Sequence, residues 1–397
     1  MTRAFAGKTA IVGIGATEFS KDSGRSTIRL AVECSDSAIR DAGLTPAQID
    51  GIVLFTVEEN PEIEVARNLG VKELTHFSRI HHSGGAACGT IHQAAMAVHN
   101  GAAKYVLVYR AFNERSGFRF GAGVQGLPTG PTPAGVDYGW SSPYGLLTPA
   151  QWVAMFARRY MHEYGATSED FGRVAVAFRK HAATNPAAFF YQKPITLEDH
   201  QNSRWIVKPL HLLDCCQESD GGQAFVVTTL ERARDLPQPP VVIASAVQGS
   251  GEDQQMMKSY YRPRITDIPE MGLCARQLWE DSGLGPQDIQ TAVLYDHFTP
   301  LILPQLEEFG FCARGEATDF IRAGNIALGG RLPVNPNGGQ LGEAYIHGMN
   351  GIAEAVRQVR GTAVNQVPQV HNVLVTAASA VPTSALILSR DRRSAAG

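Results

Sequence analysis

Two segments that lie 240 positions apart carry the same pattern of apolar and polar residues. Residues 41–55 and 281–295 both begin Asp-x-Gly-Leu, and seven of their fifteen positions are identical. An amphipathic stretch precedes each segment, and Gly43 and Gly283 suit the left-handed residue that ends a helix. Each segment closes with an apolar run typical of a buried strand. The chain therefore contains a repeated helix–turn–strand unit.

A second pair of segments extends the repeat. Residues 91–98 have helical periodicity and are followed by an apolar strand at 105–109, and residues 351–359 and 373–376 repeat this order. Alternating helices and apolar strands predict an α/β fold in which helices cover mixed or parallel sheets. We expect two similar halves.

We place the N-terminal half at residues 1–236 and the C-terminal half at 237–397. The N-terminal half is interrupted by an insertion at about 112–212, which begins with a stretch rich in Gly, Pro and aromatic residues. Helices are predicted within it at 149–164 and 168–183. A long insertion is usually functional, so we expect a lid or ligand-binding region. The alternative is an insertion without a role in ligand binding, or one that forms a dimer contact.

The first predicted strand, at residues 9–12, is followed by Gly-Ile-Gly. This arrangement is similar to the start of a dinucleotide-binding fingerprint, but Glu18 stands where the third glycine belongs and no helix clearly opens there. We expect a tight turn after the strand instead.

Charge and cysteine content narrow the function classes. The net charge is −3 and Lys and Arg form no run, which argues against a nucleic-acid partner. We expect neither a signal peptide nor a membrane span. The six cysteines form no CxxC pair, and His81-His82 has no further ligand at metal spacing. A reduced, cytoplasmic protein without a bound metal is therefore expected.

Three further motifs follow one another along the chain. They are Asp214 to Val227, Tyr295-Asp-His-Phe298, and Asn-Pro-Asn-Gly-Gly followed by Gly-Glu-Ala-Tyr-Ile-His-Gly within 334–348. With the repeat, they resemble the motifs of thiolases, including the His-Asp-Cys-Phe segment of sterol-carrier-protein thiolases. The resemblance covers essentially the whole chain. It implies the thiolase fold, in which two α/β halves form a layered αβαβα core.

The residues that thiolases use for catalysis are absent. Gly84 stands at the position of the nucleophilic cysteine, Tyr345 replaces the histidine of the Gly-His-Pro motif, and the second cysteine maps to about Ser379. Without a thiolate there is no acyl-enzyme. Cys88 lies one helical turn past Gly84; we interpret it as a core cysteine, with a displaced nucleophile as the alternative.

Tyr295 and Tyr345 are the candidate catalytic residues, because both replace residues that surround the thioester in thiolases. A phenol can donate a hydrogen bond to an enolate oxygen, or act as a base if its pKa is lowered. His297 shares the Tyr295 side of its strand and could relay a proton. His347 is a further candidate. A purely structural role stays open for both histidines.

Glycines near these residues could shape a thioester site. The backbone N–H groups of Gly84 and Gly85, at the start of a helix, could form an oxyanion hole. Gly339, in the Gly-Gly pair, could let the backbone approach the thioester. The alternative for each is a glycine-rich turn.

Within the superfamily, the pattern resembles the lipid-transfer-protein-type aldolases of bacterial steroid degradation. The resemblance implies retro-aldol cleavage of a 17-hydroxy C22 steroid-CoA to a 17-ketosteroid and propionyl-CoA. It implies that Tyr295 and Tyr345 carry the chemistry; we assign Tyr295 as the base and Tyr345 as the proton donor, and the reverse stays open. A thiolase that uses Cys88 and a non-catalytic acyl-CoA or lipid carrier are the alternatives.

The resemblance also implies partners. It predicts a homodimer and a complex with the OB-fold/zinc-ribbon domain of an enoyl-CoA hydratase subunit. The zinc would belong to that partner, and this chain would need no cofactor beyond the CoA thioester of its substrate.

Overall fold

The computed structural model has a mixed α/β architecture. It describes residues 3–81, 83–117, 119, 121, 136, 139–255, 257, 259–379 and 383–391. Nine strands form one sheet in the order β3-β2-β4-β7-β1-β8-β11-β10-β9, and β5 and β6 form a small ribbon of their own. The α/β class expected from the sequence is confirmed.

Four strands of each half follow the same order in the sheet. The first half contributes β1 (Thr9–Ala16), α1 (Thr27–Asp41), β2 (Gly51–Phe55), α2 (Glu62–Leu69), β3 (His76–Ile80), α3 (Ala87–His99), β4 (Val106–Asn113), β7 (Asp220–Thr229) and α8 (Leu230–Ala233). The second contributes β8 (Val241–Gly249), α9 (Pro269–Ser282), β9 (Thr291–Val293), α10 (Ile302–Glu308), α11 (Ala317–Arg322), α12 (Gly339–Gly342), α13 (Met349–Arg360), β10 (Asn372–Ala377) and β11 (Thr383–Arg390). The order β2-β4-β7-β1 matches β9-β10-β11-β8, and β1 pairs with β8 antiparallel. We keep the division near residue 236 as a proposal.

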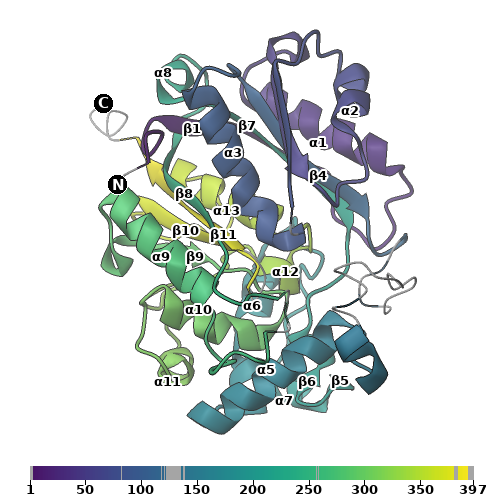
Figure 1. Ribbon diagram of the computed structural model, residues 1–397, viewed down its shortest axis with the longest axis vertical. Coiled ribbons are helices and arrows are strands. Elements are labelled where there is room, and N and C mark those ends of the chain that lie inside the picture. The colour runs from purple at the N-terminus through teal and green to yellow at the C-terminus, as the bar shows by residue number, and fades with distance from the viewer. Residues whose placement is uncertain are drawn as a thin grey trace.

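Helices lie in three layers around these strands. Helices α3 and α13 pack against strands of both halves and bury the central apolar cluster. Helix α1 covers the outer face of the first half and α9 that of the second. Figure 1 shows α3 and α13 between α1 and α9. This is the αβαβα layering that the resemblance implied.

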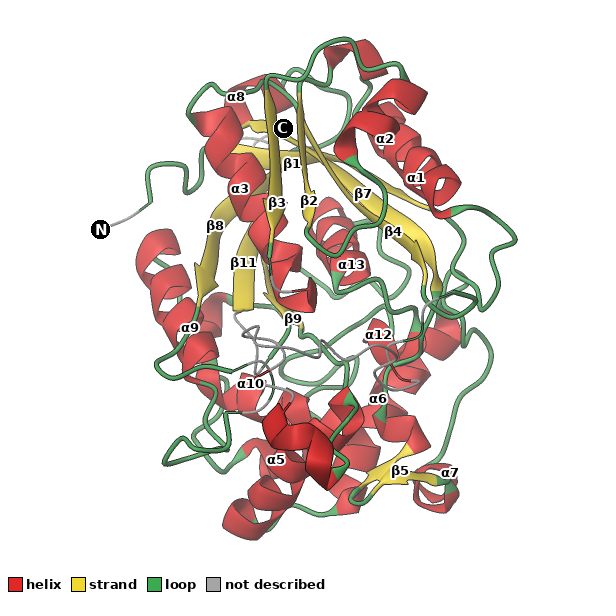
Figure 2. Cartoon of the chain, turned by 45° about the vertical axis from the view of Figure 1, so that its right-hand side comes forward, coloured by secondary structure: helices red, strands yellow, loops and turns green. Residues whose placement is uncertain are grey.

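The insertion supplies a second helical body. It contains α5 (Pro149–Tyr164), α6 (Ser168–Thr184), α7 (Leu197–Asn202), β5 (Trp205–Val207) and β6 (Leu210–His211). The predicted helices at 149–164 and 168–183 are confirmed. Thr148 caps α5 by accepting the Gln151 N–H, and Pro149 fills the first helical turn, where no amide donor is needed. Figure 2 shows α5 and α6 beside the loops at the ends of the second-half strands. Much of the Gly/Pro-rich start of the insertion lies outside the described residues.

The expected turn after the first strand is wrong. Gly13 and Gly15 lie inside β1, which continues to Ala16. A Cβ atom at Gly13 would lie 2.1 Å from the Ala38 carbonyl oxygen, and one at Gly15 would lie 2.3 Å from the Cys34 carbonyl oxygen. The glycines therefore let α1 pack directly on the strand, which is a use of glycine that a turn signal does not distinguish.

Candidate active site

The two candidate tyrosines meet at the ends of the second-half elements. Tyr295 follows β9, and Tyr345 lies between α12 and α13. The Tyr295 and Tyr345 hydroxyls are hydrogen-bonded to each other, with 3.2 Å between their oxygen atoms. Residues that are fifty positions apart in the sequence thus form a pair of phenols in direct contact.

Gly84 lies directly against the Tyr295 hydroxyl. Gly84 belongs to the short helix Ser83–Ala86 that leads into α3. A Cβ atom at position 84 would lie 2.0 Å from the Tyr295 hydroxyl oxygen and 2.7 Å from Cζ. Gly348, with φ +83°, lies on another side of the ring, where a Cβ atom would be 3.0 Å away. The phenol therefore occupies space that is free only because both positions are glycine.

Backbone hydrogen bonds hold Tyr295 in this slot. Its N–H donates to Thr376 Oγ1 at 2.9 Å, and its carbonyl accepts from Gln305 Nε2 at 2.9 Å. Thr376 also donates to Gln305 Oε1 at 2.7 Å. All three residues are buried, so the network fixes the tyrosine backbone between β10 and α10.

Asp296 supports the site by binding backbone groups. Its carboxylate accepts the N–H groups of Gln340 at 2.8 Å and Leu341 at 3.2 Å. Burial raises the pKa of this carboxyl to about 7, while the backbone N–H groups lower it. Gly339 has φ +63°, and a Cβ atom there would lie 2.1 Å from the Asp296 carboxylate. The close approach that Gly339 permits here is to Asp296; its contact with a thioester stays a prediction.

His297 is neutral and partly unpaired. Its ring centroid lies 4.9 Å from that of Tyr295. Burial lowers the pKa of the imidazole to about 3. Nδ1 is buried and has no hydrogen-bond partner within the described part of the chain. The structure thus places His297 beside Tyr295, as expected.

His347 lies beside Tyr345, with a distance of 4.8 Å between their ring centroids. Arg110 Nε donates to His347 Nδ1 at 3.2 Å, and Arg110 is paired with the buried carboxylate of Glu58 at 3.0 Å. Burial and the Arg110 charge hold the pKa of this imidazole well below its usual range. A neutral ring anchored by a buried ion pair is suited to orient Tyr345.

Both phenols are kept protonated at neutral pH. Burial raises the pKa of Tyr295 and of Tyr345 above the ordinary value of a tyrosine, and nearby Cys216 and Glu114 raise both further. The hydrogen bond with Tyr345 lowers the pKa of Tyr295 in part. Neither phenol is poised to act as a preformed phenolate.

Sequence reasoning missed Glu114. It follows β4, is 2% exposed, and has an Oε2 atom with no hydrogen-bond partner among the described residues. Burial raises the pKa of this carboxyl well above its usual range. The available signal was a charged residue directly after a buried strand, but we had assigned that position to the insertion.

Burial disfavours nucleophilic chemistry at the cysteines. Cys88 is fully buried in α3, and its Sγ lies 3.7 Å from the Val375 carbonyl oxygen. Burial raises the pKa of all six thiols above the ordinary value for cysteine. Ser379, at the place of the second thiolase cysteine, is buried as well. The core interpretation of Cys88 therefore has direct support.

The described residues offer neither a metal site nor a membrane span. They contain no group of three His, Cys, Asp or Glu side chains placed to hold an ion. None of their helices is both long enough and apolar enough to cross a bilayer.

Comparison with known proteins gives close relatives over the full chain. Residues 251–390 match the family model "Thiolase C-terminal domain-like". The chain is 69% identical to the steroid side-chain-cleaving aldolase of Thermomonospora curvata, over 97% of this chain and 99% of the relative. It is 64% identical to the 17-hydroxy-3-oxo-4-pregnene-20-carboxyl-CoA lyase of Mycobacterium tuberculosis, over 96% and 99%.

Solved structures give the same family relationship. The structure named Ltp2-ChsH2(DUF35) aldolase superposes with a TM-score of 0.94 at 67% identity, covering 98% of this chain and 100% of that chain. Human mitochondrial 3-ketoacyl-CoA thiolase in complex with CoA superposes with a TM-score of 0.68 at 14% identity and 98% coverage of both chains, a likeness of fold alone.

The buried thiols predict resistance to alkylation. We expect the folded protein to leave Cys88 unmodified by iodoacetamide at about pH 8, because the thiolate is the reactive form and burial raises its pKa. Peptide mass spectrometry would measure this, with guanidinium-unfolded protein as the control in which all six cysteines react. Rapid labelling of Cys88 in the folded protein would restore it as a candidate nucleophile.

Proposed function

The chain belongs to the thiolase superfamily, in the branch of the steroid side-chain-cleaving aldolases, and we propose that it cleaves a 17-hydroxy steroid-CoA by a retro-aldol reaction. It is an acyl-CoA lyase. The substrate named for the Mycobacterium tuberculosis relative carries a hydroxyl on C17 and a CoA thioester next to C20. The bond between these two carbons is the one that breaks.

The bond changes balance without an added reagent. The C17 hydroxyl loses its proton and becomes the ketone of a 17-ketosteroid. The electrons of the C17–C20 bond form an enolate on the thioester fragment, and protonation at C20 gives propionyl-CoA. One proton leaves the substrate and one returns, so a site that only moves a proton suffices.

The hydrogen-bonded tyrosine pair is the observation that supports this proposal most. In our mechanism Tyr295 accepts the C17 hydroxyl proton while its own proton passes to Tyr345, and Tyr345 protonates C20. The two hydroxyl oxygens lie 3.2 Å apart, close enough for a proton to pass directly between them. Neutral phenols can perform such a relay, so their raised pKa values are compatible with it.

The remaining candidates take positioning roles. We assign His297, whose Nδ1 is buried and has no partner among the described residues, as a hydrogen-bond acceptor beside Tyr295, and His347 as the group that orients Tyr345. We further propose that the backbone N–H groups of Gly84 and Gly85 stabilise the enolate oxygen, as expected for the start of a helix. No covalent enzyme intermediate and no cofactor enter the scheme.

We propose that the chain works as a homodimer bound to a DUF35 partner. The solved structure named Ltp2-ChsH2(DUF35) aldolase supports a DUF35 partner. That this partner is an OB-fold/zinc-ribbon domain of an enoyl-CoA hydratase subunit, and that it binds zinc, stay predictions. Strand β3 lies at the sheet edge with Phe77 58% exposed, which suits pairing with a second copy. Trp140 and Tyr144 are 77% and 81% exposed, which suits a surface that a partner covers.

The six unpaired cysteines support a cytoplasmic location.

Removing either hydroxyl should stop the relay. We expect Tyr295→Phe and Tyr345→Phe each to lower kcat about 100-fold or more, the range for loss of a general acid or base, with a small change in KM. Mass spectrometry of released propionyl-CoA and 17-ketosteroid, with the DUF35 partner present, measures this.

Tyr109→Phe is the matched control, because Tyr109 is also buried and donates to the Asn60 carbonyl at 2.8 Å in another part of the core. Tight binding of the thioester by the wild type without any cleavage would instead identify a carrier. Full activity of either phenylalanine variant would remove that tyrosine from the mechanism.

The raised pKa values of the two phenols predict how kcat depends on pH in alkaline solution. Above about pH 8 the Asp296 carboxyl, with a pKa of about 7, is ionised. From there to about pH 9.5 we expect a flat kcat, because both phenols still hold their protons; the rate should fall only when they ionise at higher pH. A kcat that instead rises about tenfold per pH unit would identify a phenolate as the base.

A further inference from the structure

Glu114 lies on the face of the sheet that carries the candidate active site. Side chains along a strand alternate between its two faces. In β4, Arg110 donates to His347 at 3.2 Å, and the Phe112 ring stacks on the same histidine with 5.1 Å between centroids. Glu114 is the next residue in this alternation and follows the strand directly. By this alternation its side chain points, like those of Arg110 and Phe112, toward the segment that carries Tyr345.

Ser219 joins the Glu114 carboxyl to Tyr345. The N–H of Tyr345 donates to Ser219 Oγ at 3.2 Å. The backbone of Ser219 lies close enough to the Glu114 carboxyl to lower its pKa in part. Glu114 is also one of the groups that raise the pKa of both phenols, Tyr295 and Tyr345. The carboxyl is therefore within electrostatic reach of the tyrosine pair.

Burial favours the protonated form of the Glu114 carboxyl. It raises the pKa well above its usual range, and the Glu218 charge adds to the effect. Arg110 and Lys21 lower the pKa by less, and Arg110 is already paired with the Glu58 carboxylate at 3.0 Å. Glu114 Oε2 is buried and makes no hydrogen bond within the described part of the chain. A buried polar group of this kind destabilises a fold, which is typical of a functional position.

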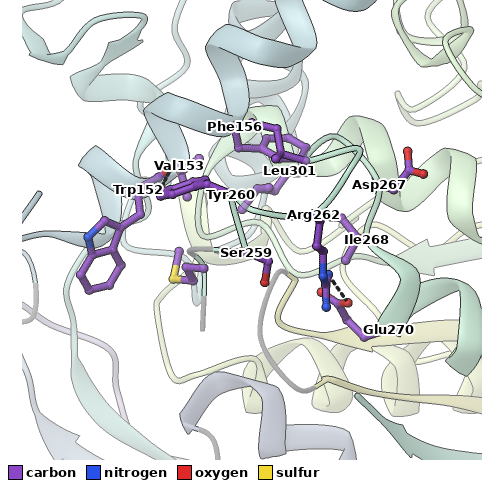
Figure 3. A pocket seen from close by; sticks show the side chains of 12 residues that line it. Trp152, Val153, Phe156, Ser259, Tyr260, Arg262, Asp267, Ile268, Glu270 and Leu301 are labelled. Atoms are coloured by element: carbon purple, nitrogen blue, oxygen red, sulfur yellow. Dashed lines mark hydrogen bonds and ion pairs between the residues drawn. The ribbon is translucent and has the colours of Figure 1, made fainter. Parts of the chain in front are cut away.

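A second buried carboxyl shows what a structural role looks like. Glu270, at the start of α9, is 1% exposed, and burial raises its pKa as well. It is ion-paired with Arg262, whose Nη1 donates to Glu270 Oε2 at 3.0 Å (Figure 3). Glu270 thus has a cationic partner for the oxygen that corresponds to the unpaired Oε2 of Glu114. The two glutamates are matched in burial and differ in pairing.

We propose that Glu114 is a further catalytic residue whose protonated carboxyl donates a hydrogen bond to the thioester oxygen as the enolate forms, an inference that rests on the proposed function. In the proposed relay Tyr345 protonates C20, and the thioester oxygen is attached to the carbon next to C20. A donor beside Tyr345 is therefore on the side of the enolate.

A neutral carboxylic acid suits this role. When the C17–C20 bond breaks, its electrons place negative charge on the thioester oxygen, and Glu114 shares its proton with that oxygen without giving it up. An ionised carboxylate would instead repel the enolate. A carboxylic acid kept neutral by its surroundings is an established means of stabilising an enolate. Glu114 would add a side-chain donor to the backbone donors proposed at Gly84 and Gly85.

Glu114→Leu removes the donor and fills most of its space. We expect kcat for the 17-hydroxy steroid-CoA to fall about 100-fold or more, the range for loss of an oxyanion-hole donor. KM should change less than about threefold, because the contact strengthens only in the transition state. Thermal unfolding should find the variant at least as stable as the wild type, since an apolar group replaces a buried polar one. Lower stability with near-normal kcat would mean a structural carboxyl and would overturn the inference.

Glu114→Gln distinguishes a hydrogen-bond donor from a group that transfers a proton. The amide still donates but cannot act as an acid or base, so we expect kcat to stay within about tenfold of the wild type. Glu270→Gln is the matched control and should keep kcat near the wild-type value. A loss in Glu114→Gln as large as that in Glu114→Leu would overturn the donor role.

The wild type tests the proposed function separately. If it cleaves no steroid-CoA in the presence of its partner, the proposed function fails and this inference fails with it. If the wild type cleaves the substrate and Glu114→Leu cleaves it equally well, only the role of Glu114 is removed.

Discussion

The contact between Gly84 and the hydroxyl of Tyr295 is the constraint on which the site depends. The backbone before α3 lies so close to the tyrosine after β9 that a side chain at position 84 would overlap the phenol, and only a glycine there leaves room for it. Position 84, which resembles the position of the thiolase nucleophile, thus lies against the phenol to which we assign acid–base chemistry. The hydrogen bond to Tyr345, the slot beside Gly348 and the backbone bonds through Thr376 and Gln305 all hold that phenol in place.

Burial then determines what this pair can do. Both phenols have raised pKa values and both neighbouring histidines have lowered ones, so these four side chains are uncharged around physiological pH. A neutral centre is poorly suited to generating a strong nucleophile, but a retro-aldol cleavage only needs a proton moved from oxygen to carbon. Glu114 adds a buried carboxyl that disfavours phenolate formation further. The electrostatics and the chemistry of the family are thus consistent.

Much of this architecture was predictable from local pattern. The repeat predicted the order of α9 and β9 from that of the earlier α1 and β2, and the helical pattern of residues 149–164 predicted α5. Tyr295 and Tyr345 were identified because they replace residues of known motifs. The contact between Gly84 and Tyr295 was not predictable, because it joins distant segments and depends on packing to within an ångström. The packing role of Gly13 and Gly15 was not predictable for a related reason, since a glycine that admits a helix has the same sequence signal as one that makes a turn. The buried environment of Glu114 depends on neighbours from distant segments, among them Lys21 and Glu218, which periodicity does not encode.

The most direct test of the account is the activity of Gly84→Ala on a 17-hydroxy steroid-CoA, with Gly139→Ala, where an added Cβ meets nothing within 4 Å, as control. A methyl group at position 84 cannot coexist with the Tyr295 hydroxyl where it lies. We predict a folded protein that binds the thioester but has lost at least 100-fold in kcat, a loss typical of a missing general acid or base. Near-normal turnover by Gly84→Ala would contradict the placement of Tyr295 at the reacting atoms and, with it, the tyrosine relay.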